Sequence, residues 1–134
     1  MTRYLLAYAA TLVAMVALDL VWLGVVAKGF YRDGIGHLMA DRPNVPVAVL
    51  FYALYALALM IFAVAPQGNA GGWRSTLVTA ALFGFFAYAT YDLTNLATLR
   101  NWPLGVSLLD MGWGTFVSAV AAAAGRGALA WAME

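Results

Sequence analysis

Three aspartates stand inside long apolar stretches of the chain, where an ionised side chain is least favourable. Asp19, Asp92 and Asp110 each interrupt a run of otherwise uncharged residues. An acid in the middle of a bilayer costs roughly 3 kcal/mol on insertion scales, so such residues face the interior of a helix bundle and mark a binding site or a proton pathway. Three buried carboxyl groups offer cation binding, proton exchange or general acid–base catalysis.

The composition places the whole chain in a membrane. Of its 134 residues 65% are hydrophobic and 10% are charged, with a mean hydropathy of +0.85, against about 45–50% apolar and about 25% charged in soluble domains. A net charge of +1 provides no basic field for nucleic acid, so we expect no nucleic-acid partner. The absence of cysteine excludes thiol chemistry and iron–sulfur sites, and a single histidine cannot supply a pair of haem ligands. We therefore expect no cofactor.

Four runs are long enough to cross the hydrocarbon core, which needs about 20 apolar helical residues. They predict helices over residues 4–27, 45–65, 75–99 and 104–125. The connections between them are short, and no alternation of period two supports a barrel. The sequence thus predicts an all-α, multi-pass four-helix bundle with short connecting loops, forming one transmembrane domain over residues 1–134. The basic residues divide three against four between the two sides, so the positive-inside rule sets no orientation.

The position of each acid along its helix predicts its depth. Asp19 and Asp92 lie close to the ends of the first and third helices, and Asp110 lies close to the start of the fourth. At 1.5 Å per residue all three fall roughly 9–12 Å below the same side of the membrane. That side carries the first and third connections, which hold most of the cations and the histidine: Lys28, Arg32, His37, Arg42 and Arg100. We expect a polar cavity that opens toward these loops, with carboxylates at its bottom and cations at its mouth.

Helical spacing adds side chains to this expected cavity, because residues three or four positions apart share one face. The candidate ligand-binding residues are Asp19, Trp22, Tyr88, Asp92, Asn95, Asp110, Trp113, Arg32 and Arg100. Asp92, with Asn95 on its face, is the first candidate for catalysis. Asp19 and Asp110 are its candidate partners, and His37 is a further catalytic candidate. No metal-ligand spacing joins His37 to the carboxylates, so the sequence predicts no metal site.

Other residues have structural interpretations. The small residues at steps of four in the last helix are expected to serve close helix packing: Asp110, Gly114, Ser118 and Ala122. Trp73, Trp102 and Trp131 are expected to anchor the helices at the membrane interface. The connection over residues 28–44 is expected to be a solvated loop with aromatic anchors, with a short amphipathic turn at the interface as the alternative.

Several stretches carry a resemblance to a known family. They are "LDLVWLGVVAKGFYRDGIGHLM", "FYALYALAL", "FAVAP", "YATYDLTNLATLRNWP" and "DMGWGT", which run in order from Leu18 to Thr115. The chain resembles a bacterial family of predicted membrane proteins known as domain of unknown function 2177. The resemblance implies a four-helix, multi-pass protein of the bacterial cytoplasmic (inner) membrane, and it assigns no activity to any residue.

Three functions fit these residues. The first is a binding or transport module, either a small helical bundle or a homodimer of it, in which the acids bind a small amphiphilic or cationic ligand, with proton coupling in the case of transport. The second is a membrane enzyme acting on a lipid or isoprenoid by isomerase- or hydratase-type acid–base chemistry, with Trp22, Trp113 and Tyr88 offering π faces to a developing cation. The third is an accessory subunit in which the acids only hold helices together. In each case membrane lipid is the expected surrounding partner.

Overall fold

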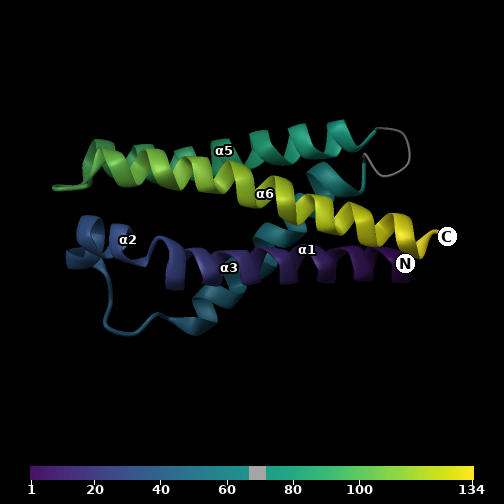
Figure 1. Ribbon diagram of the computed structural model, residues 1–134, viewed down its shortest axis with the longest axis horizontal. Coiled ribbons are helices and arrows are strands. Elements are labelled where there is room, and N and C mark those ends of the chain that lie inside the picture. Colours follow the sequence, from purple (N-terminus) through teal and green to yellow (C-terminus); the bar gives the residue numbers. More distant parts are fainter. Residues whose placement is uncertain (67–71) are drawn as a thin grey trace.

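The structure, a computed structural model, describes residues 1–66 and 72–134 as a bundle of long helices (Figure 1). Within these residues four helical segments are long and apolar enough to cross a membrane: Thr2–Val26, Val45–Val64, Trp73–Thr98 and Leu104–Ala132. The first combines α1 (Thr2–Val21) with a π-helical turn over Trp22–Val26, and the second combines α3 (Val45–Leu59) with a π-helical turn over Met60–Val64. The third is α5 (Trp73–Thr98) and the fourth is α6 (Leu104–Ala132). The all-helical prediction is confirmed.

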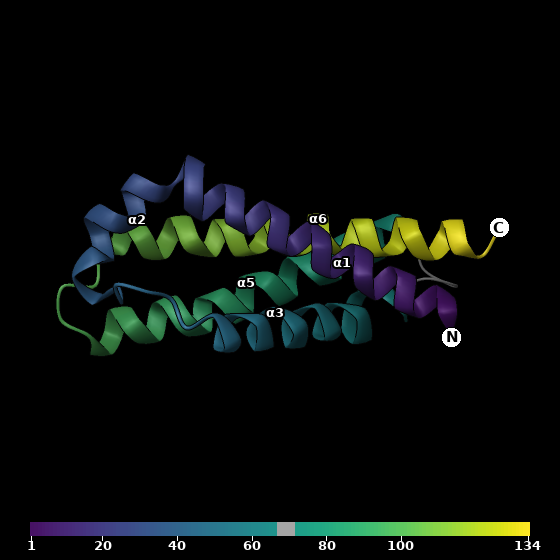
Figure 2. The ribbon, with the colours of Figure 1, turned by 90° about the horizontal axis from the view of Figure 1, so that it is seen from below.

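Both termini lie at one end of the bundle, and the turn between α5 and α6 lies at the other (Figures 1 and 2). The first connection shares the end of the α5–α6 turn, as the alternating helix directions require. Local signals begin the helices: Asn44 Oδ1 accepts the N–H of Val47 at 3.3 Å, and Pro103 precedes the first turn of α6. The end that carries both connections is therefore the end below which the sequence places the acids.

The fourth helix continues to Ala132, seven residues beyond the predicted end at 125. The predicted helix ends directly before Arg126, the charged residue that follows the apolar run. In the structure the Arg126 guanidinium donates to Thr76 Oγ1 at 3.0 Å and lies over the ring of Trp73. Because alanine favours a helix strongly, the alanine-rich residues that follow extend the helix past this charge.

The first connection is helical over residues 28–38 and not over residues 39–44. Its interpretation as a solvated loop is therefore wrong for the helical part, where the alternative of a short amphipathic turn is closer to the structure. This part forms α2 (Lys28–Ile35) followed by a 3₁₀ turn over Gly36–Leu38. Ala27 and Tyr31 are one helical turn apart and are buried against Val106 of α6. Gly34 makes this approach close, since a Cβ there would lie 2.5 Å from Val106 Cγ2. Burial of one face thus offsets the weak helix propensity of the glycines.

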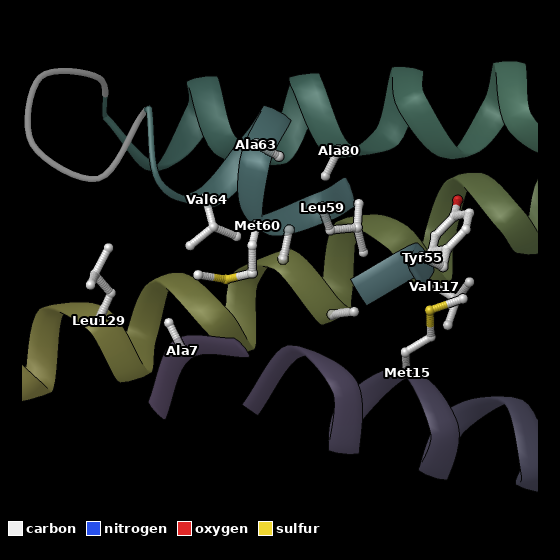
Figure 3. Packing of buried hydrophobic residues seen from close by; sticks show 12 residues of the cluster. Ala7, Met15, Tyr55, Leu59, Met60, Ala63, Val64, Ala80, Val117 and Leu129 are labelled. Atoms are coloured by element: carbon white, nitrogen blue, oxygen red, sulfur yellow. The ribbon is translucent and has the colours of Figure 1, made fainter. Parts of the chain in front are cut away.

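An apolar core fills the half of the bundle that carries the termini (Figure 3). Small residues allow close helix contact there: a Cβ on Gly125 of α6 would lie 2.1 Å from Thr11 Oγ1 of α1. Figure 3 shows the apolar side chains that fill this half. The core cluster consists of Ala7, Met15, Tyr55, Leu59, Met60, Ala63, Val64, Ala80, Val117, Ala121, Ala122 and Leu129.

Helix α3 diverges from α5 toward the end of the bundle that carries α2 (Figure 1). The π-helical turn over Met60–Val64 packs against α5 and α6, whereas α3 itself packs mainly against α1. In Figure 1 α3 crosses the bundle obliquely, so that its beginning lies away from α5. This divergence leaves room between α3 and α5 in the half that carries α2.

The turn between α5 and α6 holds a tryptophan whose side chain is buried inside the bundle. Trp102 is only 7% exposed, and its Nε1 donates to Ser107 Oγ at 2.8 Å. Asn101 before it adopts a positive φ of 58°, a conformation that asparagine tolerates better than most residues. The interface-anchor interpretation is therefore wrong for Trp102. Trp73 and Trp131 are exposed near the ends of their helices, where an anchoring role stays a prediction.

Candidate functional site

All three intramembrane aspartates line one cavity of about 560 Å³, which we call the acid-lined cavity. Asp19 comes from α1, Asp92 from α5 and Asp110 from α6. Its volume lies within the roughly 300–1,000 Å³ of small-molecule sites. The lining consists of Asp19, Leu23, Tyr31, Ile35, Met39, Phe51, Tyr52, Tyr55, Ala87, Tyr88, Tyr91, Asp92, Trp102, Val106 and Asp110. The common depth predicted from the three helix positions thus corresponds to a shared space.

Asp19 is held by donors from two other helices. The hydroxyl of Tyr52 on α3 donates to Asp19 Oδ2, and Trp113 Nε1 on α6 donates to Asp19 Oδ1 at 2.9 Å. Each carboxyl oxygen thus receives one hydrogen bond, although the side chain is buried. The hydrogen-bonding capacity of Asp19 is thus met by the neighbouring helices.

Asp110 is reached by a residue of α2. The hydroxyl of Tyr31 donates to Asp110 Oδ1 at 2.8 Å and accepts the N–H of Trp22 at 3.1 Å. Burial raises the pKa of Tyr31, and the hydrogen bond from Trp22 opposes that rise. The phenol therefore stays protonated at neutral pH and remains a donor to the acid.

Asp92 differs from the other two acids. Its side chain is fully buried, and neither carboxyl oxygen has a hydrogen-bond partner among the described residues. A second acid, Asp110, lines the same cavity. A buried polar atom without a partner costs about 1–3 kcal/mol, and more when it is charged. Asp92 thus presents unused hydrogen-bonding capacity to the cavity.

Aromatic rings form most of the remaining wall. The aromatic lining residues are Tyr31, Phe51, Tyr52, Tyr55, Tyr88, Tyr91 and Trp102. Tyr55 and Tyr88 meet edge to face with centroids 6.1 Å apart, and the Tyr55 hydroxyl lies 2.7 Å from Ser118 Oγ. The lining includes no lysine, arginine or histidine. Carboxyl groups and aromatic faces without a cation make a wall that attracts positive charge.

Glycine on α6 positions one of these rings. A Cβ on Gly114 would lie 2.2 Å from the ring of Tyr88, so the ring lies directly over the α6 backbone. Four residues later Ser118 packs against Gly84 of α5 and contacts Tyr55. The small residues of α6 thus serve helix packing, as the sequence indicated, and thereby set the position of the aromatic wall.

Two predicted tryptophans stand behind the wall instead of lining it. Trp113 contributes its N–H to Asp19, and Trp22 contributes its N–H to Tyr31. Their side chains are partly buried, and they are absent from the lining of the acid-lined cavity. Both therefore support lining residues, and a direct contact of either with a ligand stays a prediction.

Other predicted residues lie outside the acid-lined cavity. Asn95 and Arg100 do not line it, and Arg100 is exposed in the α5–α6 turn. Arg32 and His37 line a second, more polar cavity of about 520 Å³, which we call the rim cavity. Met39 lines both cavities. Of the cations predicted at the mouth, Arg32 and His37 thus line the rim cavity, whereas Lys28, Arg42 and Arg100 line neither cavity.

The sequence reasoning missed the contribution of α2 and of the α5–α6 turn. Tyr31, Ile35 and Met39 were assigned to a loop, and Trp102 to the interface, yet all four line the acid-lined cavity. The one-turn spacing of Ala27 and Tyr31 was the available signal for a buried helical face. Among residues 1–66 and 72–134, no group of three or more potential ligands is placed to hold a metal ion.

Comparison with known proteins gives a single family. Residues 4–126 match the family described as "Predicted membrane protein (DUF2177)". No curated protein matches the chain. No solved structure matches it either.

Proposed function

The chain belongs to this family of multi-pass predicted membrane proteins, and we propose that it binds an amphiphilic cation in the acid-lined cavity. The observation that carries the proposal is Asp92, a buried acceptor without a partner among the described residues, on the wall of a cavity that two other acids share. A positively charged group near Asp92 would supply the missing partner. The tyrosine faces around it add cation–π attraction, which strengthens when water is excluded.

Two residues that line the acid-lined cavity are also exposed on the outside of the bundle, which favours an amphiphilic ligand over a small ion. Tyr91 of α5 is 55% exposed and Phe51 of α3 is 45% exposed, although both line the acid-lined cavity. The cavity therefore reaches the lateral surface between α3 and α5, which faces lipid in a membrane. A ligand could place its cationic group beside the acids and leave its apolar part between the helices or among lipid tails.

One-sided access favours binding over transport by a single copy. The lining residues come from the half of the bundle that carries α2, whereas the other half is filled by the core cluster. Transport requires access from both sides in turn, which here would need a second conformation or a homodimer partner. We therefore place the ligand in one leaflet of the bacterial cytoplasmic membrane.

An accessory role in which the acids only join helices fits two of the three residues. Asp19 and Asp110 each accept hydrogen bonds from neighbouring helices. Asp92 joins nothing in the described part of the chain. A purely structural role would leave an unfavourable acceptor in place without benefit, so a ligand explains Asp92 better.

A direct test compares two ions of similar shape and opposite charge. Tetraphenylphosphonium and tetraphenylborate are titrated by calorimetry into the detergent-solubilised protein. We expect saturable binding of the phosphonium only, weakened about tenfold or more by Asp92→Asn. Asp33→Asn is the matched control, because Asp33 is exposed on α2 and lines neither cavity. Equal binding of both ions, or unchanged phosphonium affinity in Asp92→Asn, would contradict the proposal.

The environments of the acids favour one second candidate, an enzyme acting on a lipid or isoprenoid. Asp19 receives two hydrogen bonds and suits a general base, whereas Asp92 receives none and suits a general acid. Lipid extracts from cells that lack the protein would test this. A species that accumulates, and disappears again on expression of the native chain but not of Asp92→Asn, would support catalysis; unchanged lipids would contradict it.

A further inference from the structure

We infer that Asp92 and Asp110 hold one proton between them in the ligand-free protein, and that a bound cation displaces this proton. The inference rests on the proposed function for its second half, because displacement requires a ligand. The first half concerns the empty cavity alone. It can be tested without any ligand.

The burial of Asp92 in a cavity that it shares with a second acid is the first step. Asp110 lines the same cavity as Asp92, which is fully buried and has no hydrogen-bond partner among the described residues. Two carboxylates repel each other when both are ionised, and this repulsion grows where water is excluded. A single proton removes the repulsion and gives one acid a donor for the other. Closely spaced acids of this kind titrate as a pair and not as separate residues.

The surrounding groups offer no alternative source of positive charge. The groups that face this pair are Asp19 from α1, Tyr31 from α2, Tyr52 and Tyr55 from α3, and Tyr88 and Tyr91 from α5. All of these are acids or phenols, and no basic side chain lines the acid-lined cavity. Because no basic side chain of the described residues lines the cavity, a proton is the cation that can neutralise one of the two acids in the absence of a ligand.

The position of the proton follows from the donors. Asp19 already accepts hydrogen bonds from Tyr52 and Trp113. Asp110 receives Tyr31 on Oδ1, whereas Asp92 receives no donor on either oxygen. Without a donor, an ionised Asp92 would be less stable than an ionised Asp110. The proton therefore belongs mainly to Asp92, which can donate it to Asp110.

The exchange balances in charge and atoms. A cationic group enters the cavity and one carboxylic O–H bond of the pair breaks, leaving its electron pair on the carboxylate. The proton passes to water at the cavity mouth, and the new carboxylate pairs with the cation. One positive charge enters and one leaves, so the net charge of the site is unchanged. Binding should then strengthen with rising pH, by up to about tenfold per pH unit.

Proton release is measured while tetraphenylphosphonium binds. Titrations in two buffers of different ionisation enthalpy give the number of protons released per ion bound. We expect a value near one for the native chain and near zero for Asp92→Asn, in which binding is weaker but measurable at higher concentration. Asp33→Asn should behave as the native chain. Phosphonium binding by the native chain without release would overturn the inference and leave the proposed function standing.

Infrared spectroscopy tests the proton without a ligand. A shared proton gives the C=O stretch of a protonated carboxylic acid, which shifts in heavy water and should be lost in Asp92→Asn but retained in Asp33→Asn. Absence of this band from the native chain at neutral pH would overturn the inference. Presence of the band without any phosphonium binding would instead sustain the shared proton and refute the proposed function together with the displacement. Circular dichroism of both variants confirms that they fold.

Discussion

The indole rings of Trp22 and Trp113 stack face to face, with centroids 4.4 Å apart and planes within 2° of parallel. Each ring directs its N–H to a different part of the acid-lined cavity. Trp113 donates to Asp19, and Trp22 donates to Tyr31, which in turn donates to Asp110. The stack therefore joins the π-helical turn that follows α1 to α6. It fixes two of the three acids relative to each other.

Replacement of Trp113 by phenylalanine should lower stability by about 1 kcal/mol. The smaller ring keeps an aromatic surface for Trp22, but Asp19 loses one of its two donors. The free energy of unfolding in mixed micelles, followed by circular dichroism, measures this loss. Trp131→Phe is the control, because Trp131 is 71% exposed at the end of α6. Equal effects of the two substitutions would show that the hydrogen bond to Asp19 contributes nothing.

Replacement of Gly114 by alanine should disturb the cavity wall as well as the helix contact. The added Cβ would lie 2.2 Å from the Tyr88 ring, so the ring or α5 must move. We expect a loss of about 1–3 kcal/mol in the free energy of unfolding. We also expect weaker binding of tetraphenylphosphonium, because Tyr88 lines the acid-lined cavity.

The matched control for this substitution lies two residues away on the same helix. A Cβ on Gly112 meets nothing within 4 Å, so Gly112→Ala should leave binding unchanged and raise stability by up to about 1 kcal/mol through helix propensity. Similar losses of stability and binding in both variants would mean that alanine destabilises α6 for a reason other than contact with Tyr88.

The sequence could predict the fold and the level of the acids, because both follow from one-dimensional distances along helices. Asp19, Asp92 and Asp110 share a depth whatever the exact packing. Their convergence on one cavity also follows from the high cost of charge in hydrocarbon, which leaves the bundle interior as the stable place for them.

The sequence could not predict which side chains complete the wall, because that depends on how helices approach. The burial of Tyr31 depends on contact between Gly34 and Val106, residues far apart in the chain. Likewise, Trp102 is buried because the α5–α6 turn folds its indole onto Ser107. Both Arg32 and Arg100 were predicted at the mouth of the cavity. Only the structure shows that Arg32 lines the rim cavity whereas Arg100 is exposed in the α5–α6 turn.

The raised pKa of Tyr31 predicts a pH dependence of stability. Because burial raises this pKa in the folded protein, the folded state holds the phenolic proton more tightly than the unfolded chain does. Stability from this group is therefore fully present below about pH 10, the ordinary tyrosine value, and is lost as the pH rises further. The native chain should lose up to about 1.4 kcal/mol per pH unit more than Tyr31→Phe above that point.

The difference between the two chains is the quantity to measure, since other tyrosines contribute equally to both. Unfolding free energies in mixed micelles between about pH 8 and pH 11 span the relevant range. At neutral pH, Tyr31→Phe should be less stable by about 1 kcal/mol, because Asp110 loses its donor. Parallel pH profiles for both chains would refute the assignment of the alkaline loss to Tyr31.

The close approach of α2 to α6 predicts that Gly34→Ala will weaken both stability and ligand binding. Its Cβ would lie 2.5 Å from Val106 Cγ2 and 3.1 Å from Pro103 Cγ, so α2 must shift outward and move Tyr31 away from the acids. We expect a loss of about 1–3 kcal/mol in unfolding free energy, with weaker tetraphenylphosphonium binding. Gly29→Ala in the same helix is the control, because a Cβ there meets nothing within 4 Å.

A second substitution can restore the fit. Val106→Ala removes the methyl groups that the new Cβ would strike, and by itself it should cost about 1–2 kcal/mol as a cavity-forming change. In the double variant the two volume changes compensate, so the combined loss should be smaller than the sum of the single losses by about 0.5 kcal/mol or more. Phosphonium affinity should recover in parallel. Strictly additive losses would mean that Gly34 and Val106 do not touch, and that α2 does not deliver Tyr31 to the cavity by this contact.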